Sequence, residues 1–129
     1  MKYEFIPKSG NQLDYAVFPS ILHPPREFAR APVRLQVGDA RWGSQHIEFV
    51  HAQELRKAKM DVAAFVASIL KPGSPIYCEF DSMRSSQRTQ TINVRIGTVV
   101  LEYKPQGFYS IVTAFSRTRP MGELIGRLE

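Results

Sequence analysis

The spacing of apolar and polar residues changes along the chain, and these changes predict where helices and strands lie. Residues 33–37 alternate apolar and polar side chains, which is typical of a half-buried strand. Residues 45–56 and 62–70 place apolar side chains three and four positions apart, so we expect two helices in series or one bent helix. Ser44 and Asp61 precede these stretches and are the expected N-caps, because their side chains can accept hydrogen bonds from the first helical turn.

The second half of the chain is β in character. Strands are expected at residues 76–80, 89–95, 98–103 and 108–115. The loops between them are short apart from the polar loop at 81–88, and short loops make consecutive strands antiparallel neighbours. The predicted fold class is therefore α+β, with N-terminal helices packed on a four-stranded antiparallel β-meander. One sheet face would be buried by the helices and the other would be free to hold a substrate. The tail, 117–129, has weak helical character.

The first 32 residues differ from the rest, because they contain five of the nine prolines. Proline lacks a backbone donor and breaks helical periodicity, so we expect an irregular segment with short extended pieces. Residues 2–6 could form a short edge strand, and residues 18–22 an apolar plug. We divide the chain into a proline-rich N-terminal arm, 1–32, and a folded domain, 33–129. The arm is either a linker or a segment packed on that domain.

Composition limits the class of protein. A chain of 129 residues with 43% hydrophobic and 22% charged residues is typical of one globular domain and not of a disordered chain. No apolar run approaches the roughly 20 residues that span a bilayer, and the N-terminus lacks the apolar core of a signal peptide. The single cysteine, Cys78, excludes an internal disulfide and a multi-cysteine zinc site.

The chain is basic, with 17 Lys and Arg against 12 Asp and Glu, a formal charge of +5. Residues 1–80 hold 10 basic and 8 acidic side chains, whereas residues 81–129 hold 7 and 4. The excess is therefore denser over the predicted strands. Such a balance favours a polyanionic partner, either a nucleic acid or an anionic membrane.

Two of the three histidines lie on the first predicted helix. His46 and His51 are five positions apart, so on a regular helix their side chains would point about 140° away from each other. That spacing disfavours a shared metal ion, which prefers ligands three or four positions apart. Either histidine could still face a cleft and act as an acid or a base. His23, in the proline-rich arm, carries no such expectation.

The last predicted strand ends among groups that suit phosphate. Alternation places Tyr109 and Thr113 on its open face, with Arg117 and Arg119 beyond its end and Arg95 on the neighbouring strand. A guanidinium donates two parallel hydrogen bonds to a phosphate. The alternative is a solvated sheet face whose arginines bind nothing.

The order of these motifs resembles a known family. A strand is followed by Gln-His-Ile at 45–47 and His51, a helix ending in Leu-Lys-Pro at 70–72, a strand at 75–77, and Gly-Phe-Tyr-Ser-Ile-Val-Thr-Ala-Phe at 107–115. Over residues 33–119 this order, with the basic charge, resembles the phage and polymorphic-toxin branch of the barnase/EndoU/colicin/RelE (BECR) nuclease superfamily. The proline-rich arm has no counterpart in it.

The resemblance implies a metal-independent ribonuclease with no cofactor. Carried over position by position, it implies catalytic roles for five residues: His46, His51, Arg95, Tyr109 and Thr113. Ser116, Arg117 and Arg119 would bind RNA. The chemistry would be attack of the ribose 2′-hydroxyl on the adjacent phosphate, with histidine as acid or base and arginine and threonine stabilising the charge.

The resemblance also implies a biological setting. The substrate would be RNA, with tRNA one candidate, and the domain would act as a toxin in the cytoplasm after delivery from another cell or a phage within a larger protein. A cognate immunity protein would neutralise it. Two other classes stay open: a non-catalytic nucleic-acid-binding module, and a protein-interaction domain whose basic charge is incidental.

Overall fold

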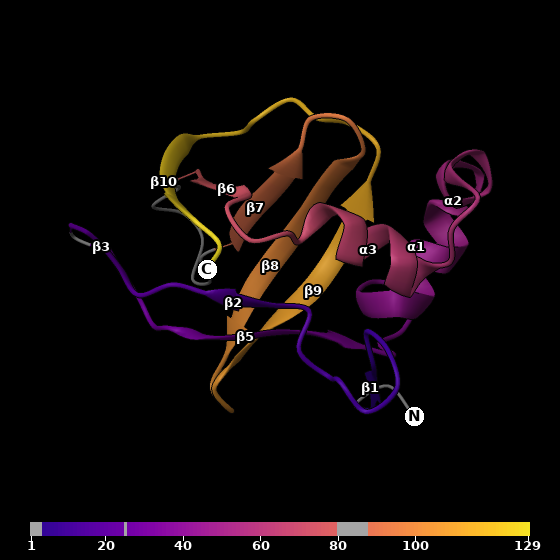
Figure 1. The fold of residues 1–129 in the computed structure, drawn as a ribbon, viewed down its shortest axis with the longest axis horizontal. Coiled ribbons are helices and arrows are strands. Elements are labelled where there is room, and N and C mark those ends of the chain that lie inside the picture. The colour runs from indigo at the N-terminus through magenta and orange to yellow at the C-terminus, as the bar shows by residue number, and fades with distance from the viewer. Residues whose placement is uncertain (1–3, 25, 80–87) are drawn as a thin grey trace.

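In the part of the chain that the structure describes, a mixed β-sheet has three short helices at one side (Figure 1). The computed structural model describes residues 4–24, 26–79 and 88–129. The sheet contains eight strands: β1 (Phe5–Ile6), β2 (Ala16–Phe18), β5 (Ala31–Gln36), β6 (Pro75–Cys78), β7 (Arg88–Asn93), β8 (Gly97–Lys104), β9 (Phe108–Phe115) and β10 (Glu123–Arg127). A separate hairpin pairs β3 (Ile21–His23) with β4 (Arg26–Phe28). The helices are α1 (Gly43–Val50), α2 (Ala52–Ala58) and α3 (Val62–Ile69).

The predicted fold class is wrong, because the sheet is larger than a four-stranded meander and strands dominate the chain. Of the residues that the structure describes, 44% lie in strands or β-bridges and 20% in helices. The strand order is β1-β5-β9-β8-β7-β6-β10, and β2 also pairs with β5. Strands β6 to β9 are consecutive antiparallel neighbours, but β5 pairs with β9 in parallel and β10 extends the opposite edge. Parallel pairing joins segments far apart in sequence, so a local pattern does not reveal it.

The two ends of the chain account for most of the added strands. β1 lies at the edge of the sheet, within the short edge strand expected at residues 2–6. β2 is only three residues long, which is too short to show a clear alternation of apolar and polar side chains. In the tail, residues Glu123–Arg127 form a strand against β6 where weak helical character was expected. The expected end of the β6 strand at Phe80 and the polar loop at 81–87 lie outside the described residues.

The proline-rich segment packs against the rest of the molecule. Tyr15, Phe18, Ile21 and Phe28 are buried in the same apolar cluster as the central strands. The Tyr15 hydroxyl group lies 3.0 Å from the carbonyl oxygen of Ile6, to which it donates a hydrogen bond. These contacts connect the segment to the sheet as a packed arm.

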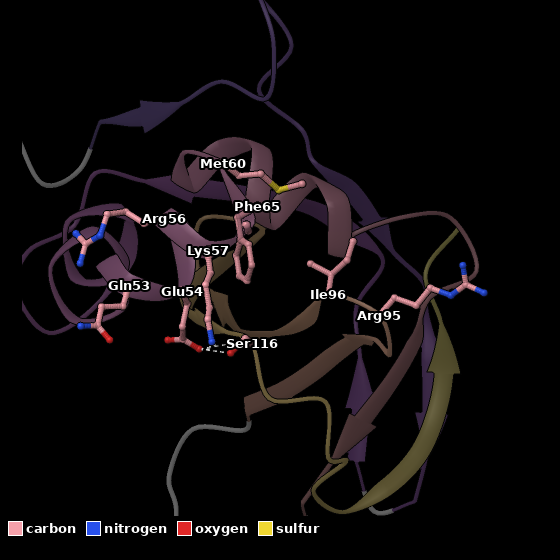
Figure 2. Close-up of a pocket in the computed structure, with 10 residues that line it drawn as sticks. Gln53, Glu54, Arg56, Lys57, Met60, Phe65, Arg95, Ile96 and Ser116 are labelled. Atoms are coloured by element: carbon pink, nitrogen blue, oxygen red, sulfur yellow. Dashed lines mark hydrogen bonds between the residues drawn. The ribbon is translucent and has the colours of Figure 1, made fainter.

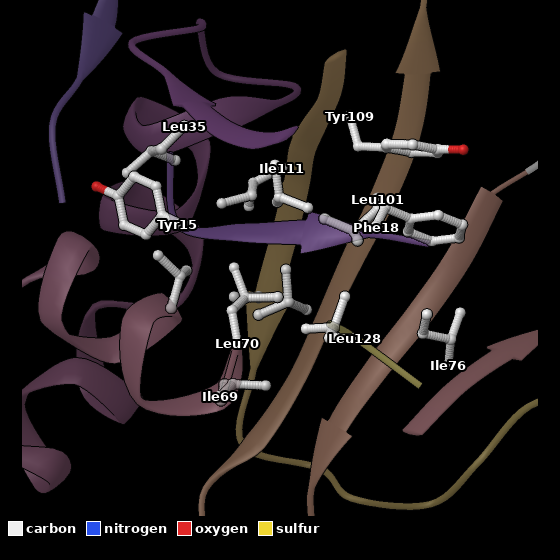
Figure 3. Packing of buried hydrophobic residues seen from close by; sticks show 14 of the residues in the cluster. Tyr15, Phe18, Leu35, Ile69, Leu70, Ile76, Leu101, Tyr109, Ile111 and Leu128 are labelled. Carbon is white, nitrogen blue, oxygen red and sulfur yellow. The ribbon is translucent and has the colours of Figure 1, made fainter. Parts of the chain in front are cut away.

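The core lies between α3 and one face of the sheet (Figure 3). Asp61 is the N-cap of α3, as predicted, and its side chain accepts a hydrogen bond from the backbone nitrogen of Ala64 at 2.8 Å. The buried face of this helix consists of Val62, Phe65, Val66 and Ile69. Spacing of three and four positions therefore identified the buried helix face.

The helical stretch before α3 is broken at His51. This residue ends α1 and begins α2, with φ −111° and ψ 28°, so the two helices meet there. Ser44 is not the N-cap of α1 but a buried residue within its first turn, and Trp42 takes the N-cap position without a side-chain hydrogen bond. The start of α1 thus depends on the preceding turn and not on a polar cap.

A β-bulge in β9 changes which face its side chains occupy. Val100 of β8 pairs with Thr113, but Leu101 pairs with Ile111, so β9 carries one extra residue between these pairs. Ile111 and Ala114 both face the core, while Thr113 lies on the opposite face. Tyr109, predicted to share an open face with Thr113, is instead buried in the core. A prediction that assumes strict alternation along the strand cannot indicate such a bulge.

Gly38 is expected to be required at the turn that leads into α1. It has φ +70°, and a Cβ atom there would lie 2.1 Å from the carbonyl oxygen of Trp42. Gly73 is a matched control, because its φ is +87° and a Cβ atom would meet nothing within 4 Å. Gly73→Ala should lower the free energy of unfolding by about 1–2 kcal/mol through backbone strain alone. Gly38→Ala should lower it by about 2 kcal/mol more, as measured by urea unfolding. Equal losses would contradict the steric role.

Candidate functional site

Three of the residues singled out in the sequence meet where α1 and α2 join over the end of β9. His46 lies in α1, His51 lies at the junction of the two helices, and Thr113 lies in β9 just after the bulge. The imidazole centroids of His46 and His51 are 5.8 Å apart and the rings are nearly perpendicular. The site is therefore built from two helices and one strand.

Hydrogen bonds hold His46 at both ring nitrogens. Its Nδ1 lies 3.0 Å from the carbonyl oxygen of Ala40, and its Nε2 lies 2.9 Å from Oγ1 of Thr113. A carbonyl oxygen can only accept, so Nδ1 carries a proton. When the ring is neutral, Nε2 accepts the hydrogen bond from the Thr113 hydroxyl; when it is charged, Nε2 donates. The ring of His46 is therefore held so that Nε2 is the nitrogen that can gain or lose a proton.

A carboxylate holds His51. Its Nδ1 donates to Oε2 of Glu54, three positions later in α2, and both side chains are about three-quarters buried, with exposures of 21% and 28%. The other carboxylate oxygen, Oε1, accepts hydrogen bonds of 2.6 Å from the backbone nitrogen and from the hydroxyl of Ser116 (Figure 2). Ser116 therefore positions Glu54, where an RNA contact was expected of it.

These hydrogen bonds change the acidity of Glu54. Burial acts to raise the pKa of this carboxyl, but the donors of Ser116 and the bonded His51 outweigh burial and lower its pKa below the usual range. Glu54 is consequently ionised at neutral pH and provides a fixed negative charge against His51. A carboxylate in this position fixes the tautomer of the imidazole and stabilises its charged form.

The break at His51 explains why the two histidines meet. On an uninterrupted helix they would point about 140° apart. The backbone of His51 leaves the helical conformation, which brings the rings together. The expectation that they diverge is therefore wrong. Each Nδ1 already bonds a protein oxygen, and within the described ranges no three His, Cys, Asp or Glu side chains form a cluster that could hold a metal ion.

The arginines expected at the site lie at different distances from it. The guanidinium of Arg117 lies over the ring of Phe115, 4.9 Å from its centroid, and that ring is 6.0 Å from the imidazole of His51. Arg95 instead lines a neighbouring pocket of about 880 Å³, and its guanidinium points away from Glu54 and Ser116 (Figure 2). Arg119 is exposed. Of the three arginines expected at the site, Arg117 is therefore the one that the ring of Phe115 connects to His51.

Tyr109 is placed apart from the site. Its ring stacks on Phe18 with centroids 4.0 Å apart, and its hydroxyl donates to the carbonyl oxygen of Ala29 at 2.7 Å. Burial, with a smaller contribution from nearby Tyr103, raises the pKa of Tyr109 above its ordinary value. The residue thus serves packing, since its hydroxyl is engaged in the core.

Sequence reasoning missed the carboxylate. Glu54 is not among the residues selected from the sequence, although its spacing of three from His51 is the signal that places the two side chains on one side of α2. The partner of its second oxygen, Ser116, lies 62 positions away, so no local pattern indicates that bond.

No family model, no curated protein and no solved structure matches the chain. The superfamily resemblance accordingly stays a prediction. In the part of the chain that the structure describes, no helix combines the length and the apolar composition that crossing a membrane requires.

Removing the Ser116 hydroxyl should raise the pKa of Glu54. Because folding lowers that pKa, the ionised carboxylate stabilises the folded chain above its unfolded pKa, and this stabilisation is lost as the pH falls through the folded value. Ser116→Ala should be less stable than the wild type near pH 7, by about 1 kcal/mol, and the gap should close in acid. Urea unfolding from pH 2 to 7 measures it, with Thr118→Ala as the control. A gap independent of pH would count against the coupling.

Tyr109→Phe should affect stability and leave any activity of the site unchanged. The substitution removes the hydrogen bond to Ala29 and keeps the ring stacked on Phe18. We expect the free energy of unfolding to fall by about 1 kcal/mol. A large loss of activity in a protein of near wild-type stability would restore Tyr109 to the catalytic group.

Proposed function

We propose that the chain is a metal-independent endoribonuclease. The observation that carries the proposal is the pairing of two differently held imidazoles, with His51 bonded to a carboxylate and His46 bonded to a hydroxyl, at a centroid separation of 5.8 Å. Cleavage by the 2′-hydroxyl needs one group to remove a proton and one to donate a proton on the same phosphate diester. Two adjacent imidazoles can supply both functions, because an imidazole can accept a proton at one ring nitrogen and release one from it.

His51 is the better candidate for the general base. Glu54 holds its Nδ1 proton, which leaves Nε2 as the basic nitrogen. When Nε2 takes the proton of the ribose 2′-hydroxyl, the ring becomes positively charged beside an ionised carboxylate. The negative charge of Glu54 stabilises that state, as a carboxylate does for a histidine base in general.

His46 is the corresponding candidate for the general acid. In its charged form it keeps one proton on Nδ1 against Ala40 and holds the second on Nε2. Transfer of the Nε2 proton to the departing 5′-oxygen completes the cleavage, leaving a cyclic 2′,3′-phosphate. Thr113 could donate a hydrogen bond, and Arg117 could contribute charge, to the phosphate oxygens as negative charge develops on them. Arg95, Arg56 and Lys57 line the pocket beyond Glu54 and are suited to flanking phosphates.

The proposal extends to the setting that the sequence predicts. The substrate is RNA, because the attacking group is the 2′-hydroxyl that DNA lacks; tRNA is one candidate. We further propose a toxin domain that acts in the cytoplasm after delivery within a larger protein. A net charge of +5 would favour an acidic immunity protein as its inhibitor.

RNA cleavage in excess EDTA tests the proposal. The wild-type chain should convert total RNA to fragments ending in a cyclic phosphate, and His46→Ala or His51→Ala should slow cleavage by about 10²–10⁴-fold. His23→Ala is the matched control, because His23 lies in the separate β3–β4 hairpin. This variant should cleave RNA like the wild type.

Two results would contradict the proposal. RNA that stays intact with the wild-type chain rules out the activity. Equal cleavage by the His46→Ala/His51→Ala double variant would mean that other residues catalyse the reaction. Salt-sensitive RNA binding that the double variant retains, without any cleavage, would favour the non-catalytic binding module.

A further inference from the structure

A second pocket lies beside the turn that orients His46. It has a volume of about 610 Å³ and is lined in part by Phe5, Gln36, Trp42, Lys104 and Phe108. These residues come from β1, β5, the turn before α1, and the β8–β9 hairpin. The volume is in the range of pockets that bind small organic ligands.

Aromatic rings form the apolar part of its wall. Phe5 and Phe108 meet edge to face with centroids 5.2 Å apart, and Trp42 supplies an indole that is only partly buried. Indole and phenyl faces are the surfaces on which single-stranded nucleic-acid bases stack in proteins. The pocket therefore offers ring surface of the kind that a nucleobase uses.

Gln36 places an available hydrogen-bond donor in the same wall. The residue is 6% exposed, and its Oε1 accepts a 2.9 Å hydrogen bond from the hydroxyl of Ser110. Among the described residues its Nε2 has no hydrogen-bond partner. This Nε2 is not fully enclosed, so a ligand or a water molecule in the pocket can accept its hydrogen bond. An acceptor on a base or a ribose would do so.

Two cations complete the pocket, and its described lining residues include no carboxylate. The ammonium group of Lys104 lies 5.7 Å from the centre of the Trp42 indole, and Arg34 lies over the ring of Phe5 at 5.5 Å. Arg34 is already paired with Asp14, at 2.8 Å, and Lys104 makes a longer bond of 3.3 Å to Glu102. Lys104 is therefore the cation better placed to bind an added phosphate.

We infer that this pocket binds one nucleotide of the RNA strand, with its base against Trp42 and its phosphate at Lys104. The inference rests on the proposed function and names a subsite for the same substrate. Trp42 and Ala40 belong to one turn, and the Ala40 carbonyl oxygen bonds Nδ1 of His46. Ser110, which holds Gln36, precedes Thr113 by three positions on β9; because of the bulge these span two residues of β8, or about 7 Å along the strand. An adjoining nucleotide of the same strand spans such a separation.

Trp42 is the only tryptophan in the chain, so its fluorescence reports on the pocket directly. We would titrate the full chain with the four ribonucleoside 3′-monophosphates, which contain no internucleotide bond and so test binding without cleavage. At least one should quench Trp42 saturably, with a Kd of about 1 mM or below. Inorganic phosphate should neither quench nor compete at the same concentrations.

Variants separate the pocket from general charge. Lys104→Ala should raise the Kd at least about fivefold, whereas Lys71→Ala, at an exposed lysine after α3, should leave it unchanged. Gln36→Glu keeps an acceptor for Ser110 and replaces the donor with a carboxylate, so it should abolish saturation; circular dichroism checks that it folds.

Three results would overturn the inference: no saturable quenching, equal affinity for inorganic phosphate, or equal effects of the two lysine substitutions. Cleavage of RNA without nucleotide binding would leave the proposed function standing and remove this subsite. Nucleotide binding without cleavage of RNA would retain the nucleotide pocket and contradict the proposed ribonuclease activity.

Discussion

The parallel pairing of β5 with β9 decides where everything else in the molecule lies. Val33 pairs with Tyr109 and Arg34 with Ser110, so both strands run towards the same end of the sheet. The chain leaves β5 at that end, turns through residues 38–42 and enters α1 beside the last residues of β9 (Figure 1). His46 and Thr113, 67 positions apart, come within 2.9 Å for this reason.

Two local irregularities then arrange the site. The bulge in β9 separates Tyr109 and Ile111, which pack in the core, from Thr113, which faces the histidines. The break at His51 turns one regular helix into two and brings two imidazoles together. The bulge adds one residue to β9, and the break takes His51 out of the helical conformation. A regular strand or a regular helix would point these groups in different directions.

The sequence predicts what local periodicity controls and fails where pairing is distant. Spacing identified α3 and its Asp61 cap, and alternation identified the strands between residues 75 and 115. The sequence also indicated His46, His51 and Thr113 as candidate site residues. It could not reveal the parallel partner of β9, the strands β2 and β10, or the bond between Ser116 and Glu54, because these depend on segments far apart in the chain. Irregular backbone at β9 and His51 leaves no periodic signal at all.

The partner of His46 Nδ1 is a main-chain atom, and this has a consequence for how the protein can vary. Every amino acid has a carbonyl oxygen, so exchange of Ala40 for another residue retains the group that sets the tautomer of His46. The restriction falls on the glycines at either end of the turn. Gly38 and Gly43 both have positive φ, and a Cβ atom on Gly43 would lie 2.9 Å from the carbonyl oxygen of Gln36. Among homologues, position 40 should therefore be free to drift while positions 38 and 43 stay glycine.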